Sequence, residues 1–161
     1  MENRRLTYCT YCFDTAGFMQ PYRNNYPFDL FPTFWENLDV LIGEGRLFSV
    51  RACYDEIVYQ EDELADWAKQ RRHIFWEHTE ALQQELKEVL SQVPTLYEAH
   101  TDRSGGDPYI VALARFKNAV LVSDEQRSRK KKDLTIHQAC DKLNIQSMRV
   151  VEFMRKEQWR F

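Results

Sequence analysis

The chain is poor in the residues that cross-link or interrupt a fold. Four cysteines, five glycines and five prolines stand among its 161 residues, which excludes a disulfide-rich scaffold and a Pro- or Gly-rich disordered tract. No apolar run approaches the roughly 20 residues that a membrane span needs. The first residues also lack the apolar segment and small-residue cleavage site of a signal peptide. We therefore expect a cytoplasmic protein with no membrane segment.

The chain also has little excess of one sign of charge over the other. The net charge is only −3, which argues against binding of nucleic acid by bulk electrostatic attraction. The balance is uneven, because acids outnumber bases across residues 54–98 and bases outnumber acids across residues 115–161. This asymmetry permits a local basic face on an acidic protein.

Apolar and aromatic residues are plentiful, at 43% and 14% of the chain. A chain of this length can bury a core without disulfides or metals. No repeat, linker or low-complexity tract divides it, so we expect a single domain over residues 1–161.

Short apolar stretches alternate with amphipathic ones along the chain. The predicted strands cover residues 6–13, 47–50, 119–122 and 145–148. The predicted helices cover residues 33–45, 52–59, two segments within 61–93, a segment that begins at 107, and residues 135–143 and 151–157. Thr33 and Glu36 have capping-box spacing and predict the start of the first helix. The strands are too apolar to be half exposed, so the order predicts an α/β fold with a mostly parallel central sheet flanked by helices.

Cys9 and Cys12 form a C-x-x-C pair two residues before Asp14. Residues three apart on a strand point to opposite faces of the sheet, and no second ligand pair with zinc-site spacing follows. We therefore interpret both thiols as packing residues rather than as a zinc or redox site. Asp14, at the end of the first predicted strand, is the better candidate for chemistry.

Acids follow two of the predicted strands. Asp14 and Asp124 lie at carboxyl ends of strands, where open parallel sheets bind their ligands. Asp107 begins the helix that leads into the strand before Asp124, which would bring its carboxylate to the same edge. Converging carboxylates repel one another unless a hard cation lies between them, and Mg²⁺ or Mn²⁺ suits oxygen ligands better than Zn²⁺ does.

Each acid also has a structural explanation. These are a strand terminus for Asp14, a helix cap for Asp107, a solvated helix position for Glu56 and a loop position for Asp124 or Glu125. Spacing alone leaves both interpretations open.

Four segments together resemble the PIN domain family. They are residues 11–15 after an apolar strand, 54–57 at a helix start, 106–114, and 120–125. Their order and spacing agree with the family over nearly the whole chain. Residues 26–35 look like a PIN-like branch of bacterial proteins that is associated with toxin–antitoxin pairs.

The resemblance implies an acidic active site. Its four catalytic acids would be Asp14, Glu56, Asp107 and Asp124. Glu125 could take the fourth place, so the implied ligands of Mg²⁺ or Mn²⁺ are Asp14, Asp107, Asp124 and Glu125. PIN proteins are typically metal-dependent ribonucleases, in which the metal activates a water that attacks an RNA phosphodiester and leaves 5′-phosphate and 3′-hydroxyl ends.

The resemblance also implies an RNA substrate and a cognate antitoxin as partners, and it admits a homodimer. Thr15 and Ser123 match the small hydroxylated residues beside the first and fourth acids. A basic run follows the fourth acid directly and would attract RNA; its residues are Arg127, Arg129, Lys130, Lys131 and Lys132.

Two other interpretations compete with this one. Haloacid-dehalogenase-like phosphatases also place an Asp at the end of the first strand, but they need a second acid two residues later, where this chain has Ala16. A non-catalytic PIN-like scaffold that binds RNA or a protein partner stays open.

Overall fold

A five-stranded, all-parallel sheet lies at the centre of the molecule. The computed structural model describes residues 8–96, 106–125 and 135–161, and of residues 106 and 107 it describes the backbone. The strands are β1 (Tyr11–Phe13), β2 (Leu47–Val50), β3 (Phe75–Trp76), β4 (Val120–Val122) and β5 (Ser147–Met148). Their order across the sheet is β3-β2-β1-β4-β5, with every neighbouring pair parallel. The predicted α/β fold with a parallel sheet is confirmed.

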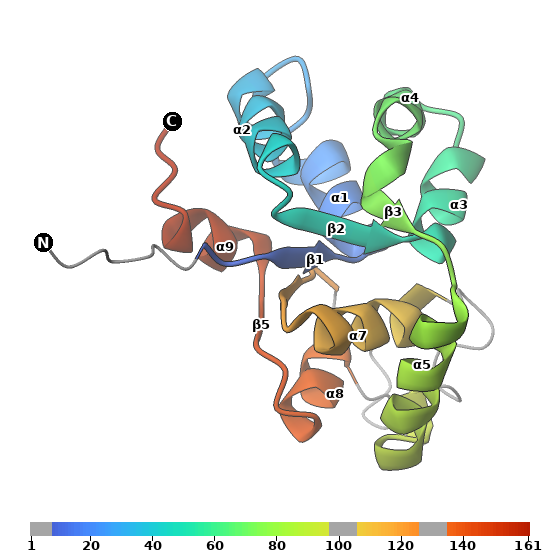
Figure 1. Cartoon of the computed structure of the whole chain (residues 1–161). Helices are drawn as coiled ribbons and strands as arrows, with labels where there is room; N and C mark the ends of the chain where they lie inside the picture. The colour runs from blue at the N-terminus through green and yellow to red at the C-terminus, as the bar shows by residue number, and fades with distance from the viewer. Residues whose placement is uncertain (1–7, 97–105, 126–134) are drawn as a thin grey trace, which may run out of the picture.

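Helices cover both faces of this sheet (Figure 1). Those drawn above it are α1 (Thr15–Gln20), which continues into the π-helix η1 (Pro21–Asn25), α2 (Pro32–Gly43), α3 (Arg51–Tyr59) and α4 (Glu63–Gln70), which is followed by the 3₁₀ turn η2 (Arg72–Ile74). Those drawn below it are α5 (Glu80–Gln92), α7 (Gly106–Lys117) and α8 (Ile136–Lys142). The last helix, α9 (Val150–Lys156), packs beside the start of β1.

The strands divide the core into two clusters, because successive side chains of a strand point to opposite faces. Tyr11 and Phe13 of β1 pack in one cluster with Phe153 of α9. Cys12 packs in the other, against buried side chains of α7 and α8. Phe153 meets Tyr11 and Phe13 edge-on, with ring centroids 4.8 and 5.0 Å apart. Burial on both faces explains why the strands are apolar throughout.

The C-x-x-C pair is split between these two clusters. Cys9 packs against the Tyr11 cluster and Cys12 belongs to the opposite one. All four cysteines are free thiols. Burial raises the pKa of the Cys12 and Cys53 thiols above their usual range. It also raises the pKa of Cys140 to about 12, with the Asp141 and Asp14 carboxylates contributing. The thiols are packing residues, as predicted.

We expect Cys12, Cys53 and Cys140 to resist alkylation in the folded protein. Each is buried, and a raised pKa leaves almost no thiolate near neutral pH, which is the reactive form. Mass spectrometry after iodoacetamide treatment should find these thiols unmodified in buffer and modified in concentrated urea. The half-buried Cys9 serves as the internal comparison. Rapid modification of Cys12 in the native protein would contradict this assignment.

Several element boundaries differ from the predictions. The first strand is confined to Tyr11–Phe13, and residues 1–7 lie outside the described part. Phe31, not Thr33, is the N-cap residue of α2, so the expected capping box is wrong; a capping box does form at Thr135 with Gln138, at the start of α8. Strand β3 was not predicted, because its two residues continue the helical spacing of the segment around them.

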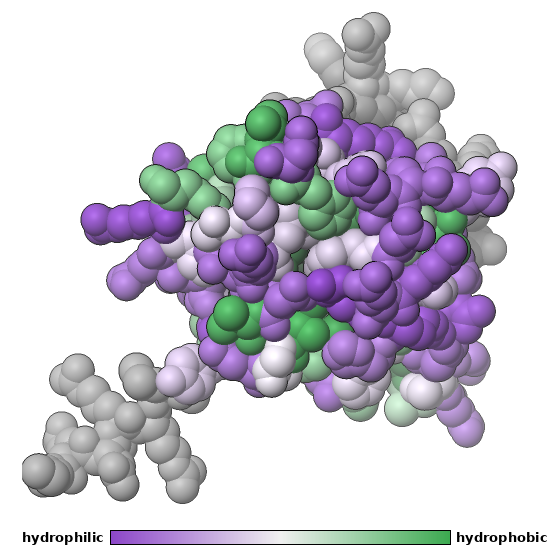
Figure 2. Space-filling view, turned by 90° about the horizontal axis from the view of Figure 1, so that it is seen from above, coloured by the Kyte–Doolittle hydropathy of each residue, from purple (hydrophilic) through white to green (hydrophobic). Residues whose placement is uncertain are grey.

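The outer surface is mainly hydrophilic on the side of α2 and α4, with smaller hydrophobic areas between the polar ones (Figure 2). Leu30 and Val40 are among the exposed apolar side chains, at 69% and 57%. Within the described ranges, no helix has the length and apolar character needed to cross a membrane.

Candidate functional site at the carboxyl ends of β1 and β4

The sheet has a topological switch point between β1 and β4. The chain passes from β1 to β2 and β3 on one side, and then returns to place β4 on the other side of β1. Crevices of this kind, outside the carboxyl ends of the strands, are where open α/β sheets bind their ligands. Asp14 directly follows β1, and Ser123 directly follows β4. The paired register Phe13 with Val122 brings these two residues together.

Asp14 is buried at this point, with 3% of its surface exposed. Its Oδ1 accepts a hydrogen bond from the backbone N–H of Gly17 at 2.8 Å and so caps α1. Its Oδ2 accepts a hydrogen bond from the Ser123 hydroxyl at 2.6 Å. Ser123 is fully buried, and its hydroxyl oxygen also accepts the Glu125 N–H at 3.0 Å. The first predicted acid and the predicted hydroxyl residue are therefore in direct contact.

Gly17 permits α1 to start against β4. A Cβ atom at this position would lie 2.9 Å from the Val122 carbonyl oxygen and 3.2 Å from the Phe13 ring. The close approach fixes the first turn of α1, whose N–H holds the Asp14 carboxylate.

Glu56 approaches the same edge from α3, which begins directly after β2. Its side chain is half-buried. Burial is the main cause of the raised pKa of the Cys53 thiol, and the carboxylates of Glu56 and Asp14 raise it further. Hydrogen bonding to Thr15 partly opposes this rise. The carboxylates of Glu56 and Asp14 therefore both act on one buried thiol.

Asp107 lies in the first turn of α7. The helix ends beside the start of β4, where the Ala119 N–H bonds the Ala114 carbonyl at 2.9 Å, so its opposite end lies toward the carboxyl edge of the sheet. The contact of α7 with α3, which begins at the carboxyl end of β2, agrees with this direction. The helix begins at Gly106, one residue earlier than predicted. The side chain of Asp107 lies outside the described part of the chain.

Asp124 and Glu125 hold the starts of two helices. Asp124 is 7% exposed, and its Oδ1 accepts the Val150 N–H of α9 at 3.0 Å and lies 3.7 Å from Nε of Arg149. Glu125 Oε2 accepts the Ile136 N–H of α8 at 2.8 Å. Both acids therefore have structural partners.

His137 is a member of this edge that the sequence did not reveal. Its Nε2 lies 3.1 Å from the Ser123 carbonyl oxygen and its Nδ1 lies 2.8 Å from the Ser147 hydroxyl oxygen. A carbonyl can only accept, so Nε2 carries the proton in this contact. His137 thereby ties α8 and β5 to the residue that bonds Asp14. No sequence signal could have found it, because the contacts join segments 10 and 14 residues apart through the fold.

The donor set at this edge fits a hard divalent cation in its chemistry. Its members are carboxylate and hydroxyl oxygens, which suit Mg²⁺ or Mn²⁺. Among the described side chains, no group of three or more His, Cys, Asp or Glu residues forms a metal site, and Asp107 is not among those side chains. The predicted basic residues Arg127, Arg129 and Lys130 likewise lie outside the described residues.

Comparison with family models matches residues 11–161 to a family described as a domain of unknown function, DUF4411. Comparison with curated proteins gives no match.

Proposed function

The chain belongs to the DUF4411 family, and we propose that it is a metal-dependent endoribonuclease, the toxin of a toxin–antitoxin pair. The supporting observation is the hydrogen-bonded pair of Asp14 and Ser123, buried at the switch point of a parallel sheet. Glu56 lies on α3, which begins at the carboxyl end of β2, and α7 begins with Asp107 in its first turn. Carboxylates gathered at one ligand-binding edge repel one another, and a bound cation would offset this repulsion.

In this proposal, Asp14, Glu56, Asp107 and one of Asp124 and Glu125 hold Mg²⁺ or Mn²⁺. The bound cation would supply activation of water and stabilisation of negative charge on the RNA phosphodiester. The Gly17 N–H and the Ser123 hydroxyl hold the two oxygens of Asp14 in place. Fixed orientation of this kind keeps the reacting groups aligned without reorganisation.

RNA and a cognate antitoxin are the proposed partners. Arg127, Arg129 and Lys130 follow Glu125 directly in the sequence, where positive charge would attract the RNA backbone. A cognate antitoxin that covers the acidic edge, and a cytoplasmic location, belong to the same proposal.

A non-catalytic scaffold is the rival. The hydrogen bonds that Asp124 and Glu125 accept from the starts of α9 and α8 favour it, because they give both acids a structural use. Such a protein would bind RNA or a protein partner without cutting RNA.

A cleavage assay separates the two functions. End-labelled RNA incubated with the purified protein should be cut when Mg²⁺ or Mn²⁺ is present, and addition of EDTA should reduce cutting to background. The products should carry 5′-phosphate and 3′-hydroxyl ends. RNA that is bound but remains uncut with either metal would support the scaffold instead. Cleavage that continues in EDTA would contradict the metal-dependent mechanism.

A further inference from the structure

An ion-pair network lies at the carboxyl ends of β2 and β3, and its members are Arg51, Asp55, Arg72 and Glu77. The strand register pairs Val50 with Trp76, the last residues of β2 and β3. Arg51 and Glu77 are the next residues and therefore come side by side. Because parallel strands end at the same edge of a sheet, this network shares the ligand-binding edge with Asp14.

Two carboxylates hold the guanidinium of Arg51. Its Nε donates to Oδ1 of Asp55 at 2.9 Å, one turn further along α3. Its Nη1 donates to both carboxylate oxygens of Glu77, at 3.1 and 3.3 Å. No described residue accepts a hydrogen bond from Nη2, and the Arg51 side chain is 43% exposed. The guanidinium is thus held in one orientation, and the N–H groups of Nη2 are left for a ligand.

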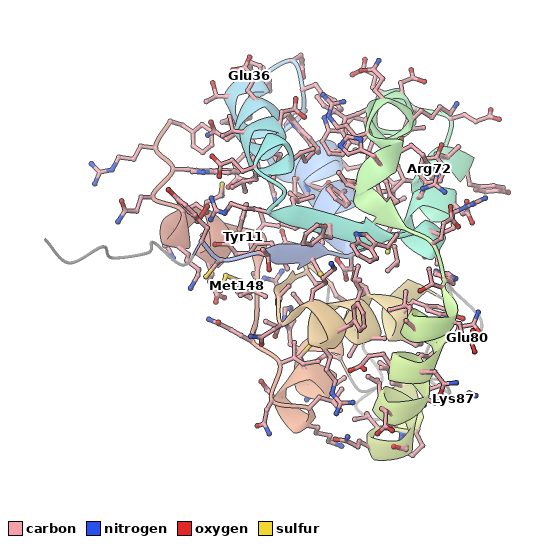
Figure 3. All side chains as sticks on the ribbon, in the orientation of Figure 1. Tyr11, Glu36, Arg72, Glu80, Lys87 and Met148 are labelled. Carbon is pink, nitrogen blue, oxygen red and sulfur yellow. The ribbon has the colours of Figure 1, made fainter. Side chains whose placement is uncertain are left out.

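Arg72 holds Glu77 independently of Arg51. Its Nη2 donates to Oε1 of Glu77, its Nη1 donates to the Phe75 carbonyl at 2.9 Å, and its guanidinium lies 4.6 Å from the centre of the Tyr54 ring. Hydrogen bonding to Arg72 is the main cause of the lowered pKa of Glu77. Figure 3 shows Arg72 on the side of the molecule toward which the strand arrows point. Glu77 therefore keeps a partner when Arg51 is replaced.

His78 connects this network to the first turn of α7. It follows Glu77, and its ring lies parallel to the ring of Tyr109, with centroids 3.7 Å apart and planes 5° apart. Tyr109 stands two residues after Asp107 in α7. Burial lowers the pKa of His78, the Glu77 carboxylate opposes this change, and the Arg51 guanidinium adds to it. Arg51 therefore acts electrostatically on a residue that stacks on the first turn of α7.

We propose that Arg51 binds a phosphate of the RNA strand, next to the phosphodiester that the proposed nuclease cuts at Asp14. Guanidinium groups match the geometry of phosphate oxygens and stay charged at any working pH. A side chain that its neighbours already orient loses less conformational freedom on binding. Strand β2 is the neighbour of β1, about 4.8 Å away, so Arg51 is within reach of the next nucleotide. The inference rests on the proposed function and adds to it a residue that binds the RNA backbone.

RNA binding without turnover tests the contact. The probe is a fluorescent single-stranded RNA oligonucleotide, measured by anisotropy with Ca²⁺ in place of Mg²⁺, and a gel checks that it stays intact. Arg51→Gln should weaken binding about tenfold, the loss expected of one hydrogen bond between charged groups. The slope of log affinity against log salt should become shallower by about 0.7, as for one lost phosphate contact to a single strand. Parent affinity in Arg51→Gln, or no RNA binding by the parent, would overturn the inference.

Arg155→Gln is the matched control. Arg155 is exposed in the last turn of α9, close to Glu157, which accepts a hydrogen bond from Tyr11 at the amino end of β1. The control removes the same charge away from the ligand-binding edge and should bind RNA as the parent does. Equal weakening in both variants would indicate an effect of net charge and would overturn the inference.

Arg51→Lys separates the guanidinium contact from charge alone. Lysine keeps the positive charge but is a flexible point charge without the planar fork. This variant should keep the salt slope of the parent and bind RNA more weakly. Should Arg51→Gln fail to fold, Arg51→Lys still decides, because parent affinity in that variant would contradict a guanidinium contact.

Steady-state cleavage separates this inference from the proposed function. Arg51→Gln should raise KM and leave kcat near the parent value, because a contact made equally in bound RNA and in the transition state changes binding alone. Cleavage that is indifferent to Arg51 would overturn the inference and leave the nuclease standing. RNA binding that depends on Arg51, in a protein that cuts no RNA, would keep the phosphate contact and contradict the nuclease. Binding of polyglutamate instead of RNA, lost in Arg51→Gln, would overturn the inference and indicate an acidic protein ligand.

Discussion

Replacement of Asp14 by Asn should lower RNA cleavage by at least about 100-fold while the fold persists. Loss of a residue that merely supports a metal ligand typically costs 10- to 100-fold, so loss of a ligand itself should cost more. Asparagine keeps an oxygen that can accept the Gly17 N–H, and it is as good an N-cap as aspartate. Its amide nitrogen cannot accept the hydrogen bond of the buried Ser123 hydroxyl, so the substitution removes negative charge from the site and should lower the free energy of unfolding by about 1–3 kcal/mol.

Cleavage rates and thermal unfolding of the Asp14→Asn protein should be measured beside those of Asp29→Asn. Asp29 is an exposed carboxylate in the turn before α2, so this control makes the same change in net charge away from the site. Growth arrest on expression gives an independent measure, since the parent protein should arrest growth and the Asp14→Asn form should not. If the folded Asp14→Asn protein cleaves RNA as fast as the parent, the assignment of Asp14 is wrong.

The fold was predictable where local pattern and burial agree. The β2 stretch and the apolar residues of β1 and β4 are buried on both faces, so the alternation of such runs with helices led directly to a parallel sheet. The π-helix at Pro21–Asn25, which is closed by the bond from the Tyr26 N–H to the Pro21 carbonyl, was not predicted. Its five residues show no helical spacing of apolar side chains. The two-residue strand β3 was missed because pairing with β2, not its own sequence, creates it.

The candidate site was predictable only in part. Asp14 and Ser123 could be located because the residue after a strand lies at the carboxyl edge, and parallel register then brings them together. The use of Asp124 to hold Val150 and Arg149 could not be foreseen, since it depends on where α9 starts relative to β5. The contact of His137 with Ser123 depends likewise on the packing of α8. Local sequence specifies where the strands end, whereas tertiary packing determines which groups the residues at those ends hydrogen-bond to.

The same substitution at two glycines should have opposite effects on stability. In Gly17→Ala, the new Cβ would lie 2.9 Å from the Val122 carbonyl oxygen and 3.2 Å from the Phe13 ring. Neither neighbour can move freely, because one is strand backbone and the other is a buried ring. Overpacking of this kind costs about 1–3 kcal/mol, and the free energy of unfolding should fall by that amount.

Gly43→Ala is the matched control, because a Cβ at Gly43 meets nothing within 4 Å and the residue ends α2. Removal of a flexible glycine from a helix should raise stability by roughly 0.4–1 kcal/mol. Urea denaturation of both variants, followed by circular dichroism, measures the two changes. Gly17→Ala should also slow RNA cleavage, since displacement of α1 moves the N–H that holds Asp14, whereas Gly43→Ala should cleave at the parent rate. Equal stability of the two variants would contradict the close approach of α1 to β4, on which the position of the Asp14 carboxylate depends.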